Sequence, residues 1–113
     1  MTSSATLRHL RIAPRKVRAV ADLVRGKRVG EALSLLRFTA KAAARPVSKL
    51  LRSAVANAVQ TGKDVDVDLL YVQTIKVDQG RTLRRFMPRA QGRATRINKK
   101  SSHVEVMLSD KRR

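Results

Sequence analysis

The fold that this chain can adopt is constrained most by one 21-residue stretch, which is unsuited to a hydrophobic core. Residues 80–100, GRTLRRFMPRAQGRATRINKK, contain eight Lys and Arg residues, and no Asp or Glu occurs between Asp78 and Glu105. The large apolar side chains of the stretch are only Leu83, Phe86, Met87 and Ile97. An isolated hairpin is at best marginally stable in water, so such a stretch needs a partner to hold its shape.

Strand patterns on both sides predict that this stretch leaves the body of the protein and returns. Residues 65–78, VDVDLLYVQTIKVD, alternate with the two-residue period of a β-strand. We expect one face to carry Tyr71, Ile75 and Val77, and the other to carry Leu70, Val72 and Thr74. Residues 102–110, SHVEVMLSD, alternate in the same way, with Val104, Val106 and Leu108 on one side.

If these two strands pair antiparallel, residues 80–100 become a long two-stranded ribbon. Pro88 and Gly92 lie where the chain must reverse, and glycine adopts positive φ at no steric cost. With about ten residues in each arm, at about 3.3 Å per residue, the ribbon reaches on the order of 30 Å beyond the core.

The remaining apolar residues favour helices, because they follow the spacing i, i+3, i+4, i+7. Pro14 opens a first helix that carries Val17, Val20, Ala21 and Val24 and stops at Gly26. A second helix carries Val29, Ala32, Leu33 and Leu36, and a third carries Val47, Leu50, Leu51, Ala54, Val55 and Ala58. Pro46 either starts the third helix near Arg45 or kinks it, and we expect the helix to reach back to about Ala42 with strain in its first turn.

Before the first helix, residues 5–12, ATLRHLRI, predict a short edge strand. Leu10 and Ile12 are expected on one side of this strand, and Arg11 on the other.

The charge of the chain indicates a polyanionic partner. Its 26 Lys and Arg against 8 Asp and Glu give a net charge of +18 over 113 residues. A domain this small repels itself at such a charge unless a polyanion neutralises it, so nucleic acid is the expected partner and an anionic membrane the second. Aromatic residues make up only 3% of the chain, which leaves little surface for stacking unpaired bases and argues against a sequence-reading single-strand binder.

Cysteine usage and hydropathy predict a soluble, cytoplasmic protein. The chain has no Cys, which excludes disulfides and thiolate metal sites and suits a reducing compartment. Its first residues, MTSSATLRHLRIAPRK, lack the apolar run of a signal peptide, and no later stretch approaches the length of a membrane span.

A basic cluster accompanies the first helix and its exit: Arg15, Lys16, Arg18, Arg25, Lys27 and Arg28. The alternative is an ordinary solvated face opposite the apolar stripe of that helix. Phosphate contact is favoured, because Asp22 is the sole acidic counterweight.

Several motifs resemble those of the bacterial ribosomal large-subunit protein twenty-two family. One is Arg84-x4-Arg89-Ala90-x-Gly92-Arg93, followed by His103-Val-x-Val-x-Leu108. Others are APRKVRAVADLVRGK (residues 13–27), SAVANAV (53–59) and VDQGRTLRRFMPRAQGRA (77–94). The resemblance covers nearly the whole chain, with its blocks in order. Ala13 departs from the Ser common before the proline, and Pro46 from the non-proline residue more usual in the third helix.

This resemblance implies an α+β fold in which three helices pack on a small antiparallel sheet, with a long extended β-hairpin. It implies one ribosomal-protein domain, with a globular body (residues 1–79 and 101–113) and an extended basic hairpin (80–100). It further implies a structural constituent of the large ribosomal subunit that binds 23S rRNA and supports assembly. The hairpin tip would line the nascent-polypeptide exit tunnel near the macrolide site, so the implied partners are 23S rRNA, neighbouring large-subunit proteins and the nascent peptide, with neither a membrane nor a small-molecule substrate.

On this basis two sets of functional residues are expected. The set expected to bind rRNA is Arg11, Arg15, Lys16, Arg18, Arg25, Lys27, Arg28, Arg81, Arg84, Arg85, Arg96, Lys99, Lys100, Ser102 and His103. The set expected to line the tunnel is Met87, Pro88, Arg89, Ala90, Gln91, Gly92 and Arg93. Arg89 and Arg93 are the side chains expected to reach the tunnel wall.

No catalytic, metal or cofactor site is expected. His9 and His103 are accompanied by neither Cys nor a nearby pair of carboxylates. An alternative function is a DNA-compacting nucleoid protein, but the sequence shows no spare apolar face for its dimer interface. A nuclease or RNA modifier would need clustered carboxylates within the basic surface, whereas four of the eight acidic residues lie in residues 61–79.

Overall fold

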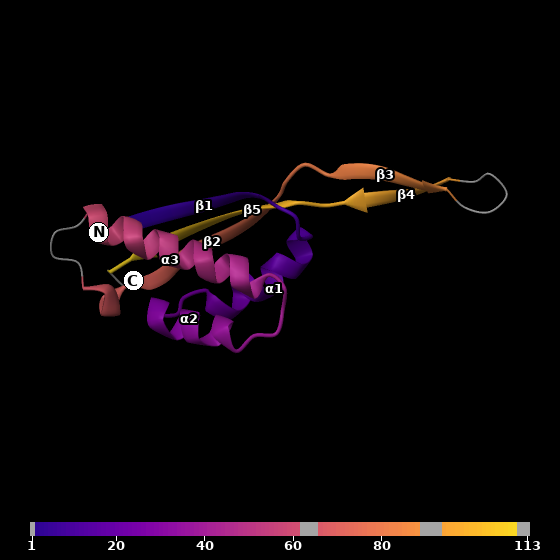
Figure 1. Ribbon diagram of the computed structural model, residues 1–113. Helices are drawn as coiled ribbons and strands as arrows, with labels where there is room; N and C mark the ends of the chain where they lie inside the picture. Colours follow the sequence, from indigo (N-terminus) through magenta and orange to yellow (C-terminus); the bar gives the residue numbers. More distant parts are fainter. Residues whose placement is uncertain (1, 62–65, 89–93, 111–113) are drawn as a thin grey trace.

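The computed structural model describes residues 2–61, 66–88 and 94–110, and of residues 83–98 it describes only the backbone of the two strands. Within these ranges the elements in chain order are β1 (Thr2–Leu10), α1 (Pro14–Val24), α2 (Val29–Arg37), α3 (Ala44–Thr61), the 3-10 turn η1 (Val67–Leu69), β2 (Tyr71–Gln79), β3 (Leu83–Pro88), β4 (Ala94–Lys99) and β5 (Ser102–Ser109). Figure 1 shows β3 and β4 extending from one end of the body that the other elements form. The molecule is elongated, measuring 66 × 26 × 21 Å along its principal axes.

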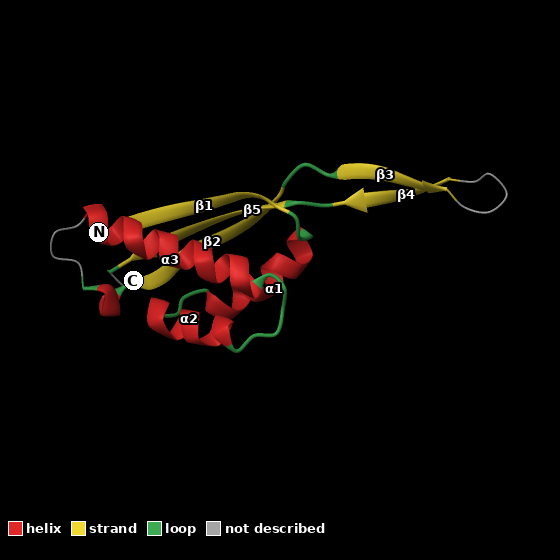
Figure 2. Ribbon diagram, viewed as in Figure 1, coloured by secondary structure: helices red, strands yellow, loops and turns green. Residues whose placement is uncertain are grey.

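The body is built on an antiparallel sheet with the strand order β1-β5-β2. The predicted antiparallel pairing of β2 with β5 is confirmed. Val104, Val106 and Leu108 of the central strand are fully buried, as predicted. They pack with apolar side chains of the helices, which lie on one side of the sheet (Figure 2), so the predicted α+β class is confirmed.

The predicted start of β2 is wrong. The strand begins at Tyr71, because Val67–Leu69 form a 3-10 turn, and Val65 lies outside the described residues. The carboxylate of Asp66 accepts a hydrogen bond from the Asp68 N–H at 3.0 Å. Such a local side-chain bond offers the backbone an alternative to strand pairing, which alternation alone does not reveal.

The predicted division of β2 into two faces is also wrong. Val72 lies in the core together with Ile75 and Val77 rather than opposite them. The pairing register with β5 shifts between Val72 and Thr74. A β-bulge adds one residue to a strand and thereby moves every later side chain to the other face.

β1 is an edge strand, as predicted, but it spans Thr2–Leu10 rather than residues 5–12. Its pairing with β5 shifts between Leu7 and Leu10, where His9 takes a positive φ of 60°. Ile12 therefore lies beyond the strand, although it still packs against the core.

The helices follow the predicted apolar stripes. α1 begins at Pro14, its Val17, Val20, Ala21 and Val24 are fully buried, and Gly26 follows with a φ of 79°. α3 begins at Ala44, so the expected extension back to Ala42 is wrong. Pro46 lies in the first turn, where backbone N–H groups have no acceptor within the helix, so the proline costs no hydrogen bond.

The predicted ribbon is present as a two-stranded sheet of its own. β3 and β4 pair antiparallel from Leu83 opposite Lys99 to Pro88 opposite Ala94. Each described strand has six residues, which corresponds to about 20 Å at about 3.3 Å per residue and forms part of the expected arm of about ten residues. The predicted reversal at Gly92 lies outside the described residues.

Candidate nucleic-acid interface

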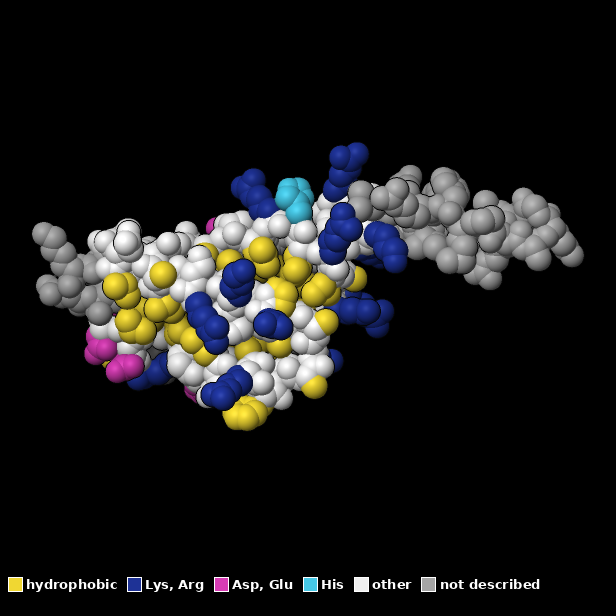
Figure 3. Space-filling view, viewed as in Figure 1, with side chains coloured by type: hydrophobic (Ala, Val, Ile, Leu, Met, Phe, Trp, Pro, Cys, Tyr) yellow, Lys and Arg dark blue, Asp and Glu magenta, His cyan; other side chains and the backbone are white. Residues whose placement is uncertain are grey.

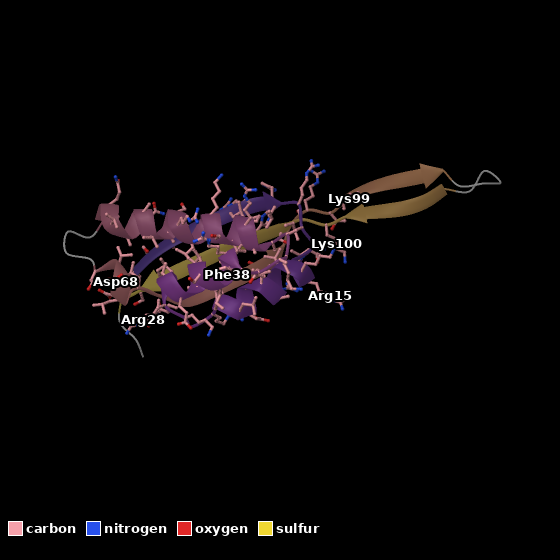
Figure 4. All side chains as sticks on the ribbon, turned by 60° about the horizontal axis from the view of Figure 1, so that its bottom comes forward. Arg15, Arg28, Phe38, Asp68, Lys99 and Lys100 are labelled. Atoms are coloured by element: carbon pink, nitrogen blue, oxygen red, sulfur yellow. The ribbon has the colours of Figure 1, made fainter. Side chains whose placement is uncertain are left out.

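The basic cluster predicted on α1 is distributed along the whole helix. Arg15 and Lys16 are exposed in the first turn and form no ion pair with a described residue. Figure 4 shows Arg15 at the end of the body that carries Lys99 and Lys100, whereas Arg28 lies at the opposite end beside Asp68. The six cations therefore do not form one patch, and those at the start of α1 are the ones near the hairpin.

Two arginines of this cluster bind the sheet. The Arg18 guanidinium donates to the carbonyl oxygen of Val77 from Nε at 3.3 Å and from Nη2 at 3.1 Å. Arg25 donates from Nη2 to the Ile75 carbonyl oxygen at 2.9 Å, and its Nη1 pairs with Asp22. Since β2 is an edge strand, these guanidinium groups satisfy carbonyls that no neighbouring strand reaches. Both arginines therefore fasten α1 to β2.

The cations after α1 also have partners within the chain. Lys27 Nζ lies 3.7 Å from a carboxylate oxygen of Glu31, one helical turn away. Arg28 donates to the Asp68 carbonyl oxygen at 3.5 Å. The positive charge of Lys27 is thus partly compensated by Glu31, whereas Arg15 and Lys16 at the start of α1 form no ion pair with a described residue.

The junction between body and hairpin, formed by residues 9–12, 80–82 and 99–103, concentrates free positive charge. Its exposed cations are Arg11, Arg81, Lys99 and Lys100. None of them forms an ion pair with a described residue. Figure 3 shows Lys and Arg side chains around the root of the hairpin, while the acidic side chains visible on this face lie mainly at the other end of the body. The resulting field attracts polyanions to the junction.

Hydrogen bonds hold the junction in shape. The Gly80 N–H donates to the Ser101 carbonyl oxygen at 2.8 Å, and the Ser101 hydroxyl donates to the Arg81 carbonyl oxygen at 2.6 Å. The Ser102 hydroxyl, fully buried, donates to the Ile12 carbonyl oxygen at 2.6 Å. Ser102 is among the residues expected to bind rRNA, but its hydroxyl is already hydrogen-bonded within the chain.

His103 also links two segments of the junction. Its Nδ1 accepts a hydrogen bond from the His9 backbone N–H at 3.1 Å, and the two imidazole rings meet edge to face with centroids 5.0 Å apart. His103 is half-buried, so part of its ring remains accessible to a partner. Within the described residues, no three His, Cys, Asp or Glu side chains are grouped closely enough to hold a metal ion.

Other expected site residues lie partly or wholly outside the described residues. Arg84, Arg85 and Arg96 belong to the part of β3 and β4, residues 83–98, of which only the backbone is described. The same holds for Met87 and Pro88. The rest of the predicted tip, residues 89–93, lies outside the described ranges.

Sequence reasoning missed a basic stripe on α3. Arg45, Lys49 and Arg52 are all exposed, and their i, i+4, i+7 spacing places them on one side of the helix. The signal was present in the sequence, because these positions complement the apolar stripe of the third helix. None of the helices in the described ranges has the length and hydropathy needed to cross a membrane.

Comparison with known proteins agrees with the resemblance seen in the sequence. The chain matches the family described as Ribosomal protein L22p/L17e over residues 5–109. It is 61% identical over 111 residues to the large ribosomal subunit protein uL22 of Myxococcus xanthus, covering 97% of each chain. It is 57% identical over 111 residues to the uL22 of Geobacter sulfurreducens, covering 98% of this chain and 99% of the relative.

A third relative, the uL22 of Anaeromyxobacter sp. strain K, is 62% identical over 104 residues, covering 92% of this chain and 71% of the relative. The family match over residues 5–109 spans the body and both strands of the hairpin, and it decides against the nucleoid-protein and nuclease alternatives. The chain therefore belongs to the ribosomal protein L22p/L17e family and is a structural component of the large ribosomal subunit, not an enzyme.

Proposed function

We propose that this chain binds 23S rRNA through the cations of the junction, the start of α1 and the hairpin. The observation that carries the proposal is the uncompensated charge at the junction, where Arg11, Arg81, Lys99 and Lys100 are exposed without an acidic partner among the described residues. Phosphates are the natural counter-charges, and the counterions released from the RNA supply much of the affinity.

We further propose that the hairpin (residues 80–100) acts as an extension of a single domain whose body is residues 1–79 and 101–113. The hairpin shares no sheet with the body, and a two-stranded sheet alone is marginally stable in water. Surrounding rRNA would hold it straight, so binding and ordering would occur together during subunit assembly. Neighbouring large-subunit proteins are the other expected partners.

A more specific role is proposed for the tip of the hairpin, residues 87–93. We propose that it lines the nascent-polypeptide tunnel near the macrolide site and contacts the nascent peptide. The support is the resemblance of Arg84-x4-Arg89-Ala90-x-Gly92-Arg93 to the family motif, together with a hairpin that projects away from the body (Figure 1).

The salt dependence of rRNA binding tests the proposed interface. Each lost phosphate contact reduces the slope of log K against log salt by about 1, so Lys99→Gln combined with Lys100→Gln should reduce it by about 2. Lys76→Gln provides a control, because Lys76 is exposed on β2 directly opposite Glu105 and lies outside the junction. An unchanged slope in the double variant, or an equal loss in the control, would refute the interface.

Drug response tests the tip. Deleting residues 83–85 or altering residues 87–93 should change macrolide susceptibility or the passage of particular nascent chains, while the body still folds. Loss of subunit assembly with an unaltered drug response would contradict the tip assignment.

A further inference from the structure

Phe38, at the end of α2, is a large apolar side chain left in solvent. It is 83% exposed, the highest value among the exposed large hydrophobic side chains of the described residues. The other aromatic side chain described, Tyr71, is 8% exposed. Figure 4 shows Phe38 on the helical side of the body, between the ends marked by Arg28 and Lys99. Among the described residues, Phe38 is therefore an aromatic ring available for stacking, despite the low aromatic content of the chain.

The backbone around Phe38 is held in place. The Phe38 N–H donates to the Ser34 carbonyl oxygen at 3.4 Å, and the Thr39 N–H donates to the Leu36 carbonyl oxygen at 3.2 Å. The Thr39 hydroxyl donates to the Leu35 carbonyl oxygen at 2.7 Å. Because the helix end is fixed, binding of a partner to the ring needs to order only the two side-chain torsions of Phe38. Preorganisation of this kind reduces the entropic cost of binding.

The surroundings of Phe38 are basic. Arg37 and Lys41 are both exposed, and neither forms an ion pair with a described residue. The acidic residue of α2, Glu31, lies in the first turn of the helix and is close to Lys27 instead. A partner that covers Phe38 must therefore neutralise positive charge as well as contact an apolar ring.

A shallow hollow connects this place to the cations at the start of α1. The hollow measures about 490 Å³ and is lined by Ile12, Arg15, Lys16, Ala19, Lys41, Ala42 and Ala43. Its lining contains three cations from two segments, an apolar floor and no acidic residue. Lys41 thus belongs both to the surroundings of Phe38 and to the rim of the hollow, so one polyanionic strand can follow the cations from α2 to α1.

We propose that Phe38 stacks on an unpaired nucleobase of the bound RNA, with the adjoining phosphates held by Arg37, Lys41 and the cations of the hollow. The inference rests on the proposed function, since it needs RNA at this face. Aromatic rings stack on unpaired bases irrespective of sequence, and cations beside the ring bind the backbone that carries them. An apolar pocket of another protein is the competing occupant, but it does not by itself account for Arg37 and Lys41.

A tryptophan probe distinguishes these occupants. The chain has no Trp, so Phe38→Trp introduces a single indole into the full-length protein. On titration with in vitro transcribed large-subunit rRNA, we expect strong quenching of the indole fluorescence, as stacking on a base produces. A Val59→Trp variant serves as control, because Val59 is 54% exposed on α3. Absence of quenching at position 38, or equal quenching at both positions, would overturn the proposal.

Affinity measurements separate stacking from simple apolar contact. We expect Phe38→Ala to bind the rRNA about 10-fold more weakly, equivalent to about 1.4 kcal/mol and within the range for one base–aromatic stack. Phe38→Tyr should retain the wild-type affinity, and Phe38→Leu should lose nearly as much as Phe38→Ala. Wild-type affinity in Phe38→Leu would refute stacking.

The outcome also separates this inference from the proposed function. If Lys99→Gln with Lys100→Gln weakens binding while Phe38→Ala does not, the stacking inference fails and the interface stands. If the wild-type chain shows no salt-dependent binding to the rRNA, the proposed function itself fails.

Discussion

Gly80 is the residue at which a single added methyl group should disturb the junction between body and hairpin. A Cβ at this position would lie 2.6 Å from the Ser101 hydroxyl oxygen and 3.1 Å from the Cε1 and Nε2 atoms of the His103 ring. Glycine is thus required here for space rather than for its backbone conformation. We predict that Gly80→Ala destabilises the protein.

The magnitude follows from the groups that must move. The Ser101 hydroxyl would have to turn away and lose its hydrogen bond to the Arg81 carbonyl oxygen, at a cost of about 1 kcal/mol. Displacing the His103 ring adds about 1–3 kcal/mol, as is usual for overpacking. The unfolded state loses entropy when glycine becomes alanine, and this stabilises the folded state by about 0.4–1 kcal/mol. The net expectation is a loss of about 2 kcal/mol.

Urea denaturation of four proteins tests this reasoning: the wild type, Gly80→Ala, Ser101→Ala and the double variant. Ser101→Ala removes the oxygen 2.6 Å from the new Cβ but leaves the His103 ring in place, so Gly80→Ala should cost only about 1 kcal/mol in that background. The midpoints should shift at constant m-value. Wild-type stability in Gly80→Ala would refute the steric account, as would additivity of the two substitutions within about 0.3–0.5 kcal/mol.

Three other substitutions or measurements examine the body and the hairpin. Amide hydrogen exchange across residues 81–100 should be fast in the free protein and slow on bound rRNA, and strong protection without RNA would contradict the claim that RNA orders the hairpin. Val106→Ala should cost about 2 kcal/mol by urea denaturation, because Val106 is fully buried in the central strand. Its control, Val59→Ala on the exposed side of α3, should change stability by less than about 0.5 kcal/mol, and equal effects would mean that the assigned core is wrong. Arg18→Met should lower stability by about 1 kcal/mol, because the hydrogen bonds to the Val77 carbonyl oxygen are lost. Arg15→Met removes no such bond to the sheet and should leave stability unchanged in the same assay.

The candidate interface shows where reasoning from residue spacing stops. Charge and spacing singled out four exposed cations, Arg15, Lys16, Arg18 and Arg25. Of these, Arg18 and Arg25 also donate hydrogen bonds to carbonyl oxygens of β2. In the sequence all four are alike, because nothing in a helical pattern says which cations face the edge of a sheet. Spacing and charge also do not indicate that Phe38, at the end of α2, is exposed.

The sequence by itself determined the elements that local physics controls. The apolar stripe that follows Pro14 specifies α1, and the alternation of Val104, Val106 and Leu108 specifies the buried face of β5. The excess of Lys and Arg in residues 80–100 predicts a segment that needs a polyanion. These features depend only on the period of each element and on charge, so they can be found without knowing what packs against what.

Tertiary structure decided the features that depend on two segments meeting. The register shift after Val72 belongs to the pairing of β2 with β5, and it reverses the faces that alternation predicts. The close approach of Gly80 to Ser101 and His103 exists because the hairpin leaves the sheet there. The 83% exposure of Phe38 is likewise seen only in the folded structure. Each depends on contacts between residues far apart in the chain, which neither a local period nor a sum of charges contains.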